Sequence, residues 1–389
     1  MIKVGFTLIG NGNWTGGENY LVNMLKVIAK YLSDDIQPYL FISAEQFEKV
    51  KNSFDSLLSE PPIIDRRIKG AGTGVRAIRA LLLGADKPAE ALFKEYGIDV
   101  VFECAQFFGY KFDIPIVSWI PDFQHKHLAH LFSSFAKTKR EFGFKCQTNG
   151  SRTVMLSSAD ALNDLKTFYP RASQKSFIVP FAINMELVKH YNRVEHVRKT
   201  YSLPERFFYL PNQYWRHKNH KVVIEALGIL ANSENLAMLP PIILTGRTSD
   251  PRDPELFNDD MALIKGYGAQ NHYRHLGLIP YEDVLALNAG SDAIINPSLF
   301  EGWSTPVEES KALGSSMILS DISLHREQAP GAHFFKADDP ASLANILRSY
   351  KSSTRPKLHD LTKSQEKRLQ DYANSLLGVF HSAHIVAQA

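Results

Sequence analysis

Several common sequence features are scarce or missing in this chain. It has only two cysteines, Cys104 and Cys146, and neither belongs to a closely spaced pair or a metal-binding motif. This argues against a disulfide framework and a zinc site, and it is typical of a protein in a reducing cytosol. No run approaches the ~18 consecutive apolar residues of a membrane-spanning helix. The first residues read as a buried strand rather than a signal peptide, so any membrane association is expected to be peripheral.

Long runs of one charge are also missing. The formal net charge is +3, which argues against a dedicated nucleic-acid-binding protein. The residues before position 185 carry a small excess of positive charge. This imbalance is explained either by an anionic membrane or acceptor on the N-terminal side or by ordinary scatter of surface charge.

The chain is long enough for two hydrophobic cores, because it has 389 residues, of which 44% are apolar. Short β-branched or aromatic runs alternate with helical patterns, one of them a helix expected over 74–96. Such alternation predicts an α/β fold with parallel sheets, repeated in two doubly wound halves. The expected domains are 1–185, 186–360 and a C-terminal helix over 361–389 that packs back towards the first domain. Ligands are then expected beyond the carboxyl ends of the strands, in a cleft between the domains.

One stretch links a strand to a helix through a tight loop, and it reads Asn296-Pro-Ser-Leu-Phe-Glu-Gly-Trp-Ser-Thr-Pro-Val-Glu-Glu-Ser-Lys-Ala-Leu-Gly. Thr305 stands before Pro306 and three residues before Glu308, which predicts a capping box, with Gly314 as the stop. The amides of this helix start, reached through Gly302, Ser304 and Thr305, predict an anion site for a diphosphate.

Glu301 and Glu309 flank that loop, and here the sequence resembles a known family. Ser298-Leu-Phe-Glu-Gly-Trp-Ser-Thr-Pro-Val-Glu-Glu-Ser is similar to the Glu-x7-Glu signature of family-four retaining glycosyltransferases. Leu319-Ser-Asp-Ile-Ser-Leu-His-Arg-Glu and Leu276-Gly-Leu-Ile-Pro-Tyr-Glu-Asp match that family as well. The resemblance implies a GT-B fold with two facing Rossmann-like domains.

The resemblance also implies residue roles. Glu309 would bind the ribose of the nucleotide, Glu301 would contact the transferred sugar, and the backbone from Leu278 and Ile279 to Pro280 would border the nucleobase. The diphosphate would lie at the loop that includes Gly302, Trp303, Ser304 and Thr305.

The resemblance assigns the cation for the diphosphate to Lys218. The family arginine expected five residues earlier is missing, since Gln213 stands there. Whether Arg216 reaches the same phosphate oxygens stays open. A fixed cation is expected because a departing nucleoside diphosphate develops negative charge.

Two further candidates lie in the first half. Gly16 and Gly17 resemble the family's glycine loop, in which backbone amides approach a phosphate or an acceptor; a structural turn is the alternative. Thr15 occupies the third glycine position of a dinucleotide fingerprint, which weighs against an NAD-dependent oxidoreductase. Asp122 and His125 are expected to point to the cleft, with His125 either orienting sugar hydroxyls or serving as a polar helix residue.

The sequence therefore predicts a retaining glycosyltransferase that moves a sugar from a nucleoside diphosphate sugar to a glycan or lipid-linked acceptor. The resemblance suggests bacterial surface polysaccharide synthesis, in the cytoplasm or at the inner face of its membrane. No Asp-x-Asp occurs, so no metal and no other cofactor are expected. A nucleotide-sugar epimerase and a non-catalytic sugar-nucleotide-binding protein are the alternatives. Aromatic side chains that either line an acceptor groove or belong to the core are Trp14, Phe107, Phe108 and Tyr110.

Overall fold

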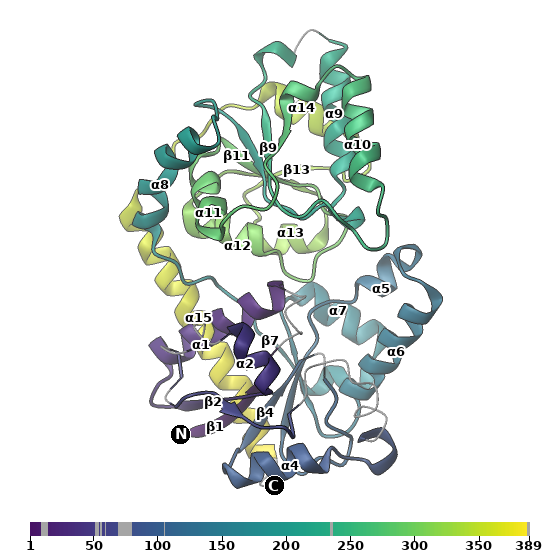
Figure 1. Ribbon diagram of the computed structural model, residues 1–389, viewed down its shortest axis with the longest axis vertical. Helices are drawn as coiled ribbons and strands as arrows, with labels where there is room; N and C mark the ends of the chain where they lie inside the picture. The colour runs from purple at the N-terminus through teal and green to yellow at the C-terminus, as the bar shows by residue number, and fades with distance from the viewer. Residues whose placement is uncertain are drawn as a thin grey trace. The chain divides into compact units, whose positions relative to one another are not determined.

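The computed structural model of the chain describes residues 1–8, 15–50, 54, 57–58, 60–68, 80–104, 106–233 and 236–386. It divides into two compact units. The N-terminal unit comprises Met1–Phe123, Ser134–Asn184 and the chain from Lys367 onward, and the C-terminal unit comprises Gln124–Ser133 and Met185–Glu366. Figure 1 shows that each unit consists of a sheet covered by helices.

The N-terminal unit contains a seven-stranded sheet with the strand order β3-β2-β1-β4-β5-β6-β7 and parallel pairing throughout. Its strands are β1 (Ile2–Thr7), β2 (Ile36–Ile42), β3 (Ile63–Ile64), β4 (Val100–Glu103), β5 (Ile116–Trp119), β6 (Thr153–Leu156) and β7 (Ser176–Ile178). Its helices include α1 (Thr15–Tyr31), α2 (Ala44–Val50), α4 (Lys87–Glu95), α6 (Ser134–Thr148), α7 (Ala159–Phe168) and the 3₁₀ helix η2 (Pro170–Lys175).

The C-terminal unit contains a six-stranded parallel sheet with the order β10-β9-β8-β11-β12-β13. Its strands are β8 (Phe208–Leu210), β9 (Ile242–Leu244), β10 (Tyr273–His275), β11 (Ala293–Asn296), β12 (Met317–Ser320) and β13 (His333–Phe335). Its helices are α5 (Gln124–His127), α8 (Leu187–Thr200), α9 (His220–Ala231), α10 (Leu256–Gly266), α11 (Tyr281–Gly290), α12 (Thr305–Leu313), α13 (Ser323–Gln328) and α14 (Pro340–Ser349), with the 3₁₀ helices η1 (Ala129–Leu131), η3 (Arg216–Lys218), η4 (Leu236–Met238) and η5 (Gln270–His272).

Both sheets confirm the predicted doubly wound α/β class. Strand β11 is buried along its whole length, as expected for a central parallel strand covered on both faces. In each sheet the strand order runs outward in two directions from a central pair of strands. This pair is β1 and β4 in the N-terminal unit, and β8 and β11 in the C-terminal unit. The loops after such a pair diverge to opposite faces and leave a crevice at the carboxyl ends, where α/β proteins bind ligands. In the C-terminal unit a ligand site is therefore expected at the loops after β8 and β11.

The prediction of one continuous helix over 74–96 is wrong in the extent of the helix. Gly84 has a positive φ of 84° and interrupts the helical pattern, and α4 begins only at Lys87. The side chain of Asp86 caps this start by accepting a hydrogen bond from the Ala89 amide. Residues 69–79 lie outside the described residues.

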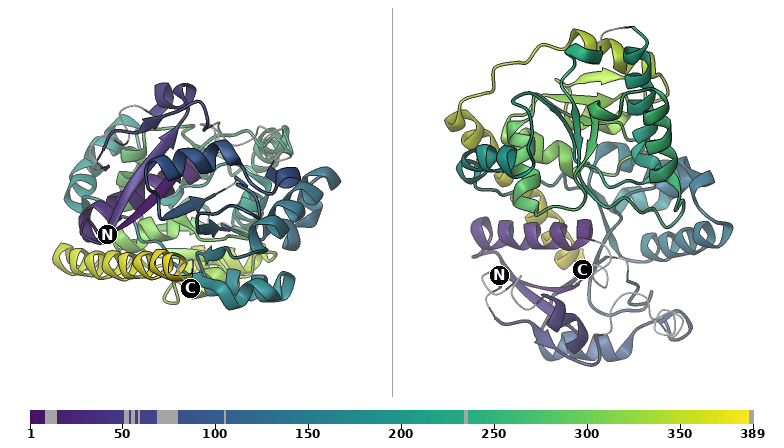
Figure 2. Two further views of the ribbon diagram at one scale, coloured as in Figure 1. Left: turned by 90° about the horizontal axis from the view of Figure 1, so that it is seen from below. Right: turned by 45° about the horizontal axis from the view of Figure 1, so that its top comes forward.

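Helix α15 (Leu358–Val386) contributes to both units. Its first residues belong to the C-terminal unit, whereas those from Lys367 onward belong to the N-terminal unit. Within the N-terminal unit, the Phe380 ring contacts the rings of Phe6 and Phe102. Figure 2 shows α15 in yellow as one uninterrupted helix.

The segment Gln124–Ser133 groups with the C-terminal unit, although the sequence-based boundary places it in the first domain. Two ring contacts account for this. His127 stacks on Phe300 with the ring centroids 5.0 Å apart, and the Arg252 guanidinium lies over the Phe132 ring at 5.9 Å. Neither contact has a sequence pattern that would reveal it.

Candidate active site

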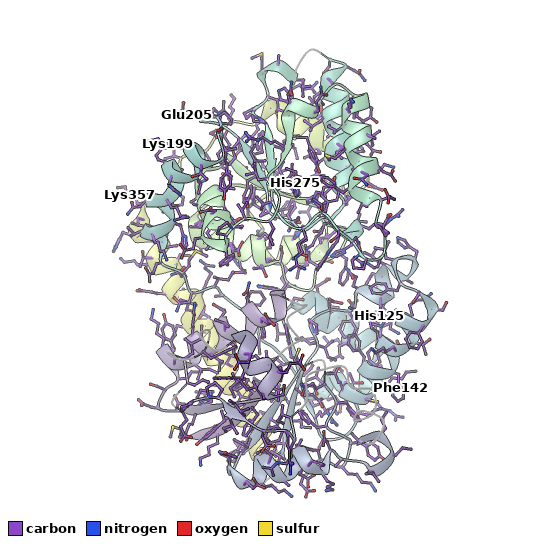
Figure 3. All side chains as sticks on the ribbon, viewed as in Figure 1. His125, Phe142, Lys199, Glu205, His275 and Lys357 are labelled. Carbon is purple, nitrogen blue, oxygen red and sulfur yellow. The ribbon has the colours of Figure 1, made fainter. Side chains whose placement is uncertain are left out.

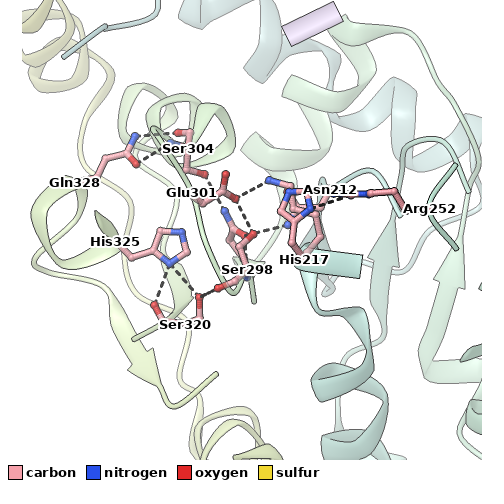
Figure 4. Close-up of polar contacts among 11 residues, drawn as sticks. Asn212, His217, Arg252, Ser298, Glu301, Ser304, Ser320, His325 and Gln328 are labelled. Carbon is pink, nitrogen blue, oxygen red and sulfur yellow. Dashed lines mark hydrogen bonds and ion pairs between the residues drawn. The ribbon is translucent and has the colours of Figure 1, made fainter. Parts of the chain in front are cut away.

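Glu301 lies in the loop between β11 and α12 and forms a largely buried ion pair. Its Oε1 accepts hydrogen bonds from Lys218 Nζ and from Ser298 Oγ, both at 2.6 Å (Figure 4). The side chains of Glu301 and Lys218 are 10% and 12% exposed. Burial by itself would raise the pKa of Glu301, but the Lys218 ammonium, His325 and the two hydrogen bonds lower it to about 2. Glu301 is therefore ionised throughout the physiological range.

Lys218 is the last residue of η3, which follows β8. Two loops hold this turn in place, because the Leu299 amide donates to the His217 carbonyl and Asn219 Nδ2 donates to the carbonyls of Pro297 and Ala337. Asn219 itself adopts the left-handed conformation, with φ of 56°. In the described chain Lys218 Nζ has no second partner, so two of its three N–H bonds are available for an anion.

The start of α12 differs from the predicted capping box. The helix begins at Thr305, next to the expected start, and Gly314 ends it as predicted, but its N-cap is Ser304, and that side chain makes no capping hydrogen bond. Instead Gln328 Oε1 accepts from the Ser304 amide, and Gln328 Nε2 donates to the Ser304 carbonyl. Glu308 pairs with Lys311 and Gln328, so its predicted role in the cap is wrong.

Several amides at this helix start remain available for an anion. Among the residues that the structure describes, the amides of Gly302, Thr305 and Val307 have no acceptor. The amide of Ser304, another predicted phosphate contact, is already occupied by Gln328. Ser304 Oγ accepts a hydrogen bond from Asn296 Nδ2 and is buried. Ser304 therefore positions the loop, while its neighbours present the free amides.

Replacing Gln328 with alanine is expected to lower the free energy of unfolding by about 2–4 kcal/mol, because three buried hydrogen bonds are lost, one of them to a carboxylate. Chemical denaturation measures this. Gln370→Ala is the matched control, since Gln370 is exposed and bonds only to Asn374 in the described chain. Equal unfolding midpoints for the two variants would contradict the assigned role of Gln328.

Glu309 is buried without a counter-ion. Its Oε1 accepts a hydrogen bond from Tyr281 Oη at 2.6 Å, and Oε2 has no partner within the described part of the chain. Burial raises the pKa of Glu309 to about 7, and the Tyr281 hydrogen bond lowers it only in part. A buried carboxylate with so few partners is costly for folding and is suited to accept hydrogen bonds from ligand hydroxyls.

Tyr281 was not predicted as a site residue. It is the first residue of α11, directly after Pro280, in the segment whose resemblance suggested a nucleobase contact. Of the two residues assigned to that contact, Leu278 is 69% exposed and Ile279 packs partly against the core. Tyr281 could have been found as a hydroxyl at a helix start after that segment.

His325 was also missed. Its Nδ1 lies 2.9 Å from the Ser320 carbonyl oxygen, which can only accept, so Nδ1 carries the proton and Nε2 is the acceptor in the neutral ring. Nε2 is buried and has no partner among the described residues. Burial lowers the pKa of His325 despite the nearby carboxylate of Glu301. A neutral histidine beside an ionised carboxylate adds a hydrogen-bond acceptor to the site.

Arg216 does not join the Lys218–Glu301 pair. Its Nη1 forms an ion pair with Asp253, and its side chain is 59% exposed. Arg252, in the same loop as Asp253, donates to Asp250 and lies 3.3 Å from His217 Nδ1 (Figure 4). Trp303 lies beneath the Lys311 ammonium, which is 5.9 Å from the ring centroid. Arg216 thus has Asp253 as its partner in this structure, and whether it contacts a diphosphate stays open.

The candidates of the N-terminal region are spread over both units. Gly16 and Gly17 lie in the first turn of α1, whereas Gly10–Trp14 lie outside the described residues. Asp122 in the N-terminal unit pairs with Arg140 at 3.5 Å, and His125 in the C-terminal unit is buried. Phe108 packs against Phe93 in the core.

The described residues were expected to contain neither a metal site nor a membrane-spanning helix. In the described ranges no three His, Cys, Asp or Glu residues cluster as metal ligands would. Likewise, within those ranges, every helix is too short or too polar to span a bilayer.

Residues 195–368 match the family of glycosyl transferases group 1. The O-antigen chain mannosyltransferase RfbU of Salmonella typhimurium is 22% identical over 243 residues, which cover 54% of this chain and 66% of RfbU. A glycosyltransferase of Rickettsia africae superposes with a TM-score of 0.65 at 16% identity, covering 100% of this chain and 98% of that one. HepE of Anabaena, solved with UDP and glucose, gives 0.62 at 14% identity and covers 100% and 99%.

Residues 195–368 are therefore similar to the group 1 glycosyltransferases, and the chain has the GT-B fold. The predicted fold class is confirmed, and the predicted resemblance is confirmed as similarity to the group 1 glycosyltransferases over residues 195–368. Retention of configuration stays a prediction. The roles of individual site residues and the predicted cleft between the domains stay predictions.

Proposed function

We propose that this protein is a retaining glycosyltransferase that transfers a sugar from a nucleoside diphosphate sugar to an acceptor hydroxyl. The observation that supports this best is the largely buried Lys218–Glu301 pair, which joins the loops after β8 and β11. It combines a fixed cation with a fixed anion where a doubly wound sheet binds ligands. The free amides of Gly302, Thr305 and Val307 lie in the loop and helix start that follow Glu301.

Each group has a role in this proposal. Lys218 and the helix start of α12 bind the diphosphate and stabilise the charge that grows on it as the bond to the sugar breaks. Glu301 accepts hydrogen bonds from hydroxyls of the transferred sugar. Glu309 accepts hydrogen bonds from the ribose after Tyr281 is displaced. Leu278 and Ile279 border the nucleobase, and Trp303, Gly16, Gly17, Asp122 and His125 remain candidates for contacts with sugar or acceptor.

The reaction needs no protein nucleophile. The bond between the anomeric carbon and the leaving phosphate oxygen breaks, and a bond to the acceptor oxygen forms on the same face. The acceptor proton moves to the leaving phosphate oxygen, so the configuration is retained. Because Lys218 and the helix start supply the positive charge, we propose that the reaction requires neither a metal nor another cofactor.

The acceptor in this proposal is a glycan or a lipid-linked oligosaccharide of a bacterial surface polysaccharide, and the enzyme acts in the cytoplasm or at the inner face of the membrane. The name of RfbU, an O-antigen chain mannosyltransferase, supports this class of acceptor. The relatives do not agree on the sugar, since RfbU is described as a mannosyltransferase and HepE was solved with UDP and glucose.

One nucleoside diphosphate is expected to raise the melting temperature of the protein well above the others. A ligand at 100 times its dissociation constant stabilises the native state by about 2.7 kcal/mol. The experiment compares UDP, GDP, dTDP and ADP by thermal shift, each once in excess EDTA and once with magnesium. If none of the four stabilises the protein under either condition, the donor site is refuted. If stabilisation requires magnesium, the metal-free mechanism is wrong.

The preferred donor, carrying a radioactive sugar, then separates the transferase from an epimerase. A transferase leaves the donor intact without an acceptor, apart from slow hydrolysis. An epimerase converts it to an altered sugar nucleotide without any acceptor.

A further inference from the structure

Helix α6 of the N-terminal unit exposes two phenylalanine rings. Phe135 is 79% exposed and Phe142 is 51% exposed. They are seven residues apart, so they lie on the same face of the helix about 10 Å from each other. Figure 3 labels Phe142 at the outer edge of the N-terminal unit. Exposed apolar side chains that share one face can mark a site for a protein partner or a membrane.

Basic side chains share this face. Lys139 and Lys145 follow Phe135 by four and ten residues, and both are exposed. The helix carries two further basic residues, Lys137 and Arg140, and a single acidic residue, Glu141. Glu141 accepts a hydrogen bond from Tyr169 Oη and lies 3.6 Å from Lys145. The outward face of α6, defined by Phe135, Lys139, Phe142 and Lys145, is therefore apolar and positively charged.

The opposite face fixes α6 to the unit. The ring of Phe144 packs edge-on against Phe123 with the centroids 5.5 Å apart, and Gln147 and Thr148 are buried. The orientation of the exposed face is thus set by the fold.

We infer that the outward face of α6 is a docking surface for an anionic lipid bilayer. Phenylalanine rings enter the boundary between head groups and acyl chains, while lysine stems reach the charged head groups. A polyanion such as nucleic acid would engage the lysines but would leave the two rings without an apolar environment. The inference deepens the proposed function and rests on it. A lipid-linked acceptor lies in a membrane, so an enzyme that uses it has to reach the bilayer surface.

The test is co-sedimentation of the full chain with vesicles of phosphatidylcholine alone or mixed with phosphatidylglycerol. The wild-type protein is expected to bind the mixed vesicles, and added salt should weaken this binding. Phe135→Ser with Phe142→Ser should weaken it at least about tenfold. Lys139→Gln and Lys145→Gln should each weaken it about fivefold. Met238→Ser is the control, because Met238 is 89% exposed on the other unit, and it should bind as the wild type does.

Three results would overturn the docking surface: no binding of the wild type to mixed vesicles, full binding by the phenylalanine variant, or lysine-dependent binding to double-stranded DNA in place of vesicles. Nucleotide stabilisation is measured on the same preparations. Vesicle binding without nucleotide binding would refute the proposed function and leave the surface standing. Nucleotide binding without vesicle binding would do the reverse.

Discussion

Replacing Lys218 with alanine is expected to reduce turnover about 10²–10³-fold, because the leaving diphosphate loses a fixed charge that stabilises it. The same change leaves the Glu301 carboxylate buried without its cation, which costs stability, on the order of 3 kcal/mol. Steady-state rates with the preferred sugar donor and denaturation curves measure the two effects. Lys221→Ala is the matched control, since Lys221 is 64% exposed and lies on α9, which begins two residues after Lys218.

A double variant separates stability from catalysis. Lys218→Met with Glu301→Gln removes both charges at similar volume, so most of the lost stability should return while turnover stays low. Near-normal turnover in Lys218→Ala would refute the catalytic assignment. Recovery of turnover together with stability in the double variant would show that Lys218 acts only through folding.

Glu309→Gln is expected to weaken nucleotide binding about 10–100-fold, because the ribose hydroxyls lose a charged acceptor. The variant should also be more stable at neutral and higher pH. The pKa of Glu309 is raised from 4.5 to about 7 in the folded protein, so the folded state binds this proton more tightly than the unfolded state. Wild-type stability therefore falls as the pH rises from about 4.5 through about 7, by roughly 3 kcal/mol in total.

The measurements are nucleotide titration calorimetry and denaturation between pH 4 and about 8, the range in which this carboxyl titrates. The gain in stability of Glu309→Gln should vanish at the acidic end and be complete at the alkaline end. Glu282→Gln on the same helix as Tyr281 is the control, because Glu282 is exposed and paired with Lys189. An unchanged nucleotide affinity would remove Glu309 from the ribose site.

The sequence predicted the elements that carry the site because their patterns are local. The run from Asn296 to Gly314 fixes a strand, a tight loop and a helix, and the two sheets follow from the alternation of apolar runs. What the sequence could not reveal is pairing over long separations. Lys218 and Glu301 are 83 residues apart, and their hydrogen bond follows no periodicity.

The error at the start of α12 has the same origin. Thr305, Pro306 and Glu308 satisfy the spacing of a capping box, but Gln328 from α13 occupies the Ser304 amide. A side chain from another helix thus replaced the local cap. The pairing of Tyr281 with Glu309 was missed for a related reason, since nothing in the segment of Tyr281 indicates a carboxylate 28 residues further along the chain.

The division of α15 between the two units has a practical consequence for recombinant work. A fragment that ends near residue 185 would lack Phe380, which contacts Phe6 and Phe102, so it would present bare aromatic surface to water. Expressing the first unit alone would therefore require grafting the chain from Lys367 onward to its end. The alternative is a circular permutant in which the chain from Lys367 onward precedes residue 1.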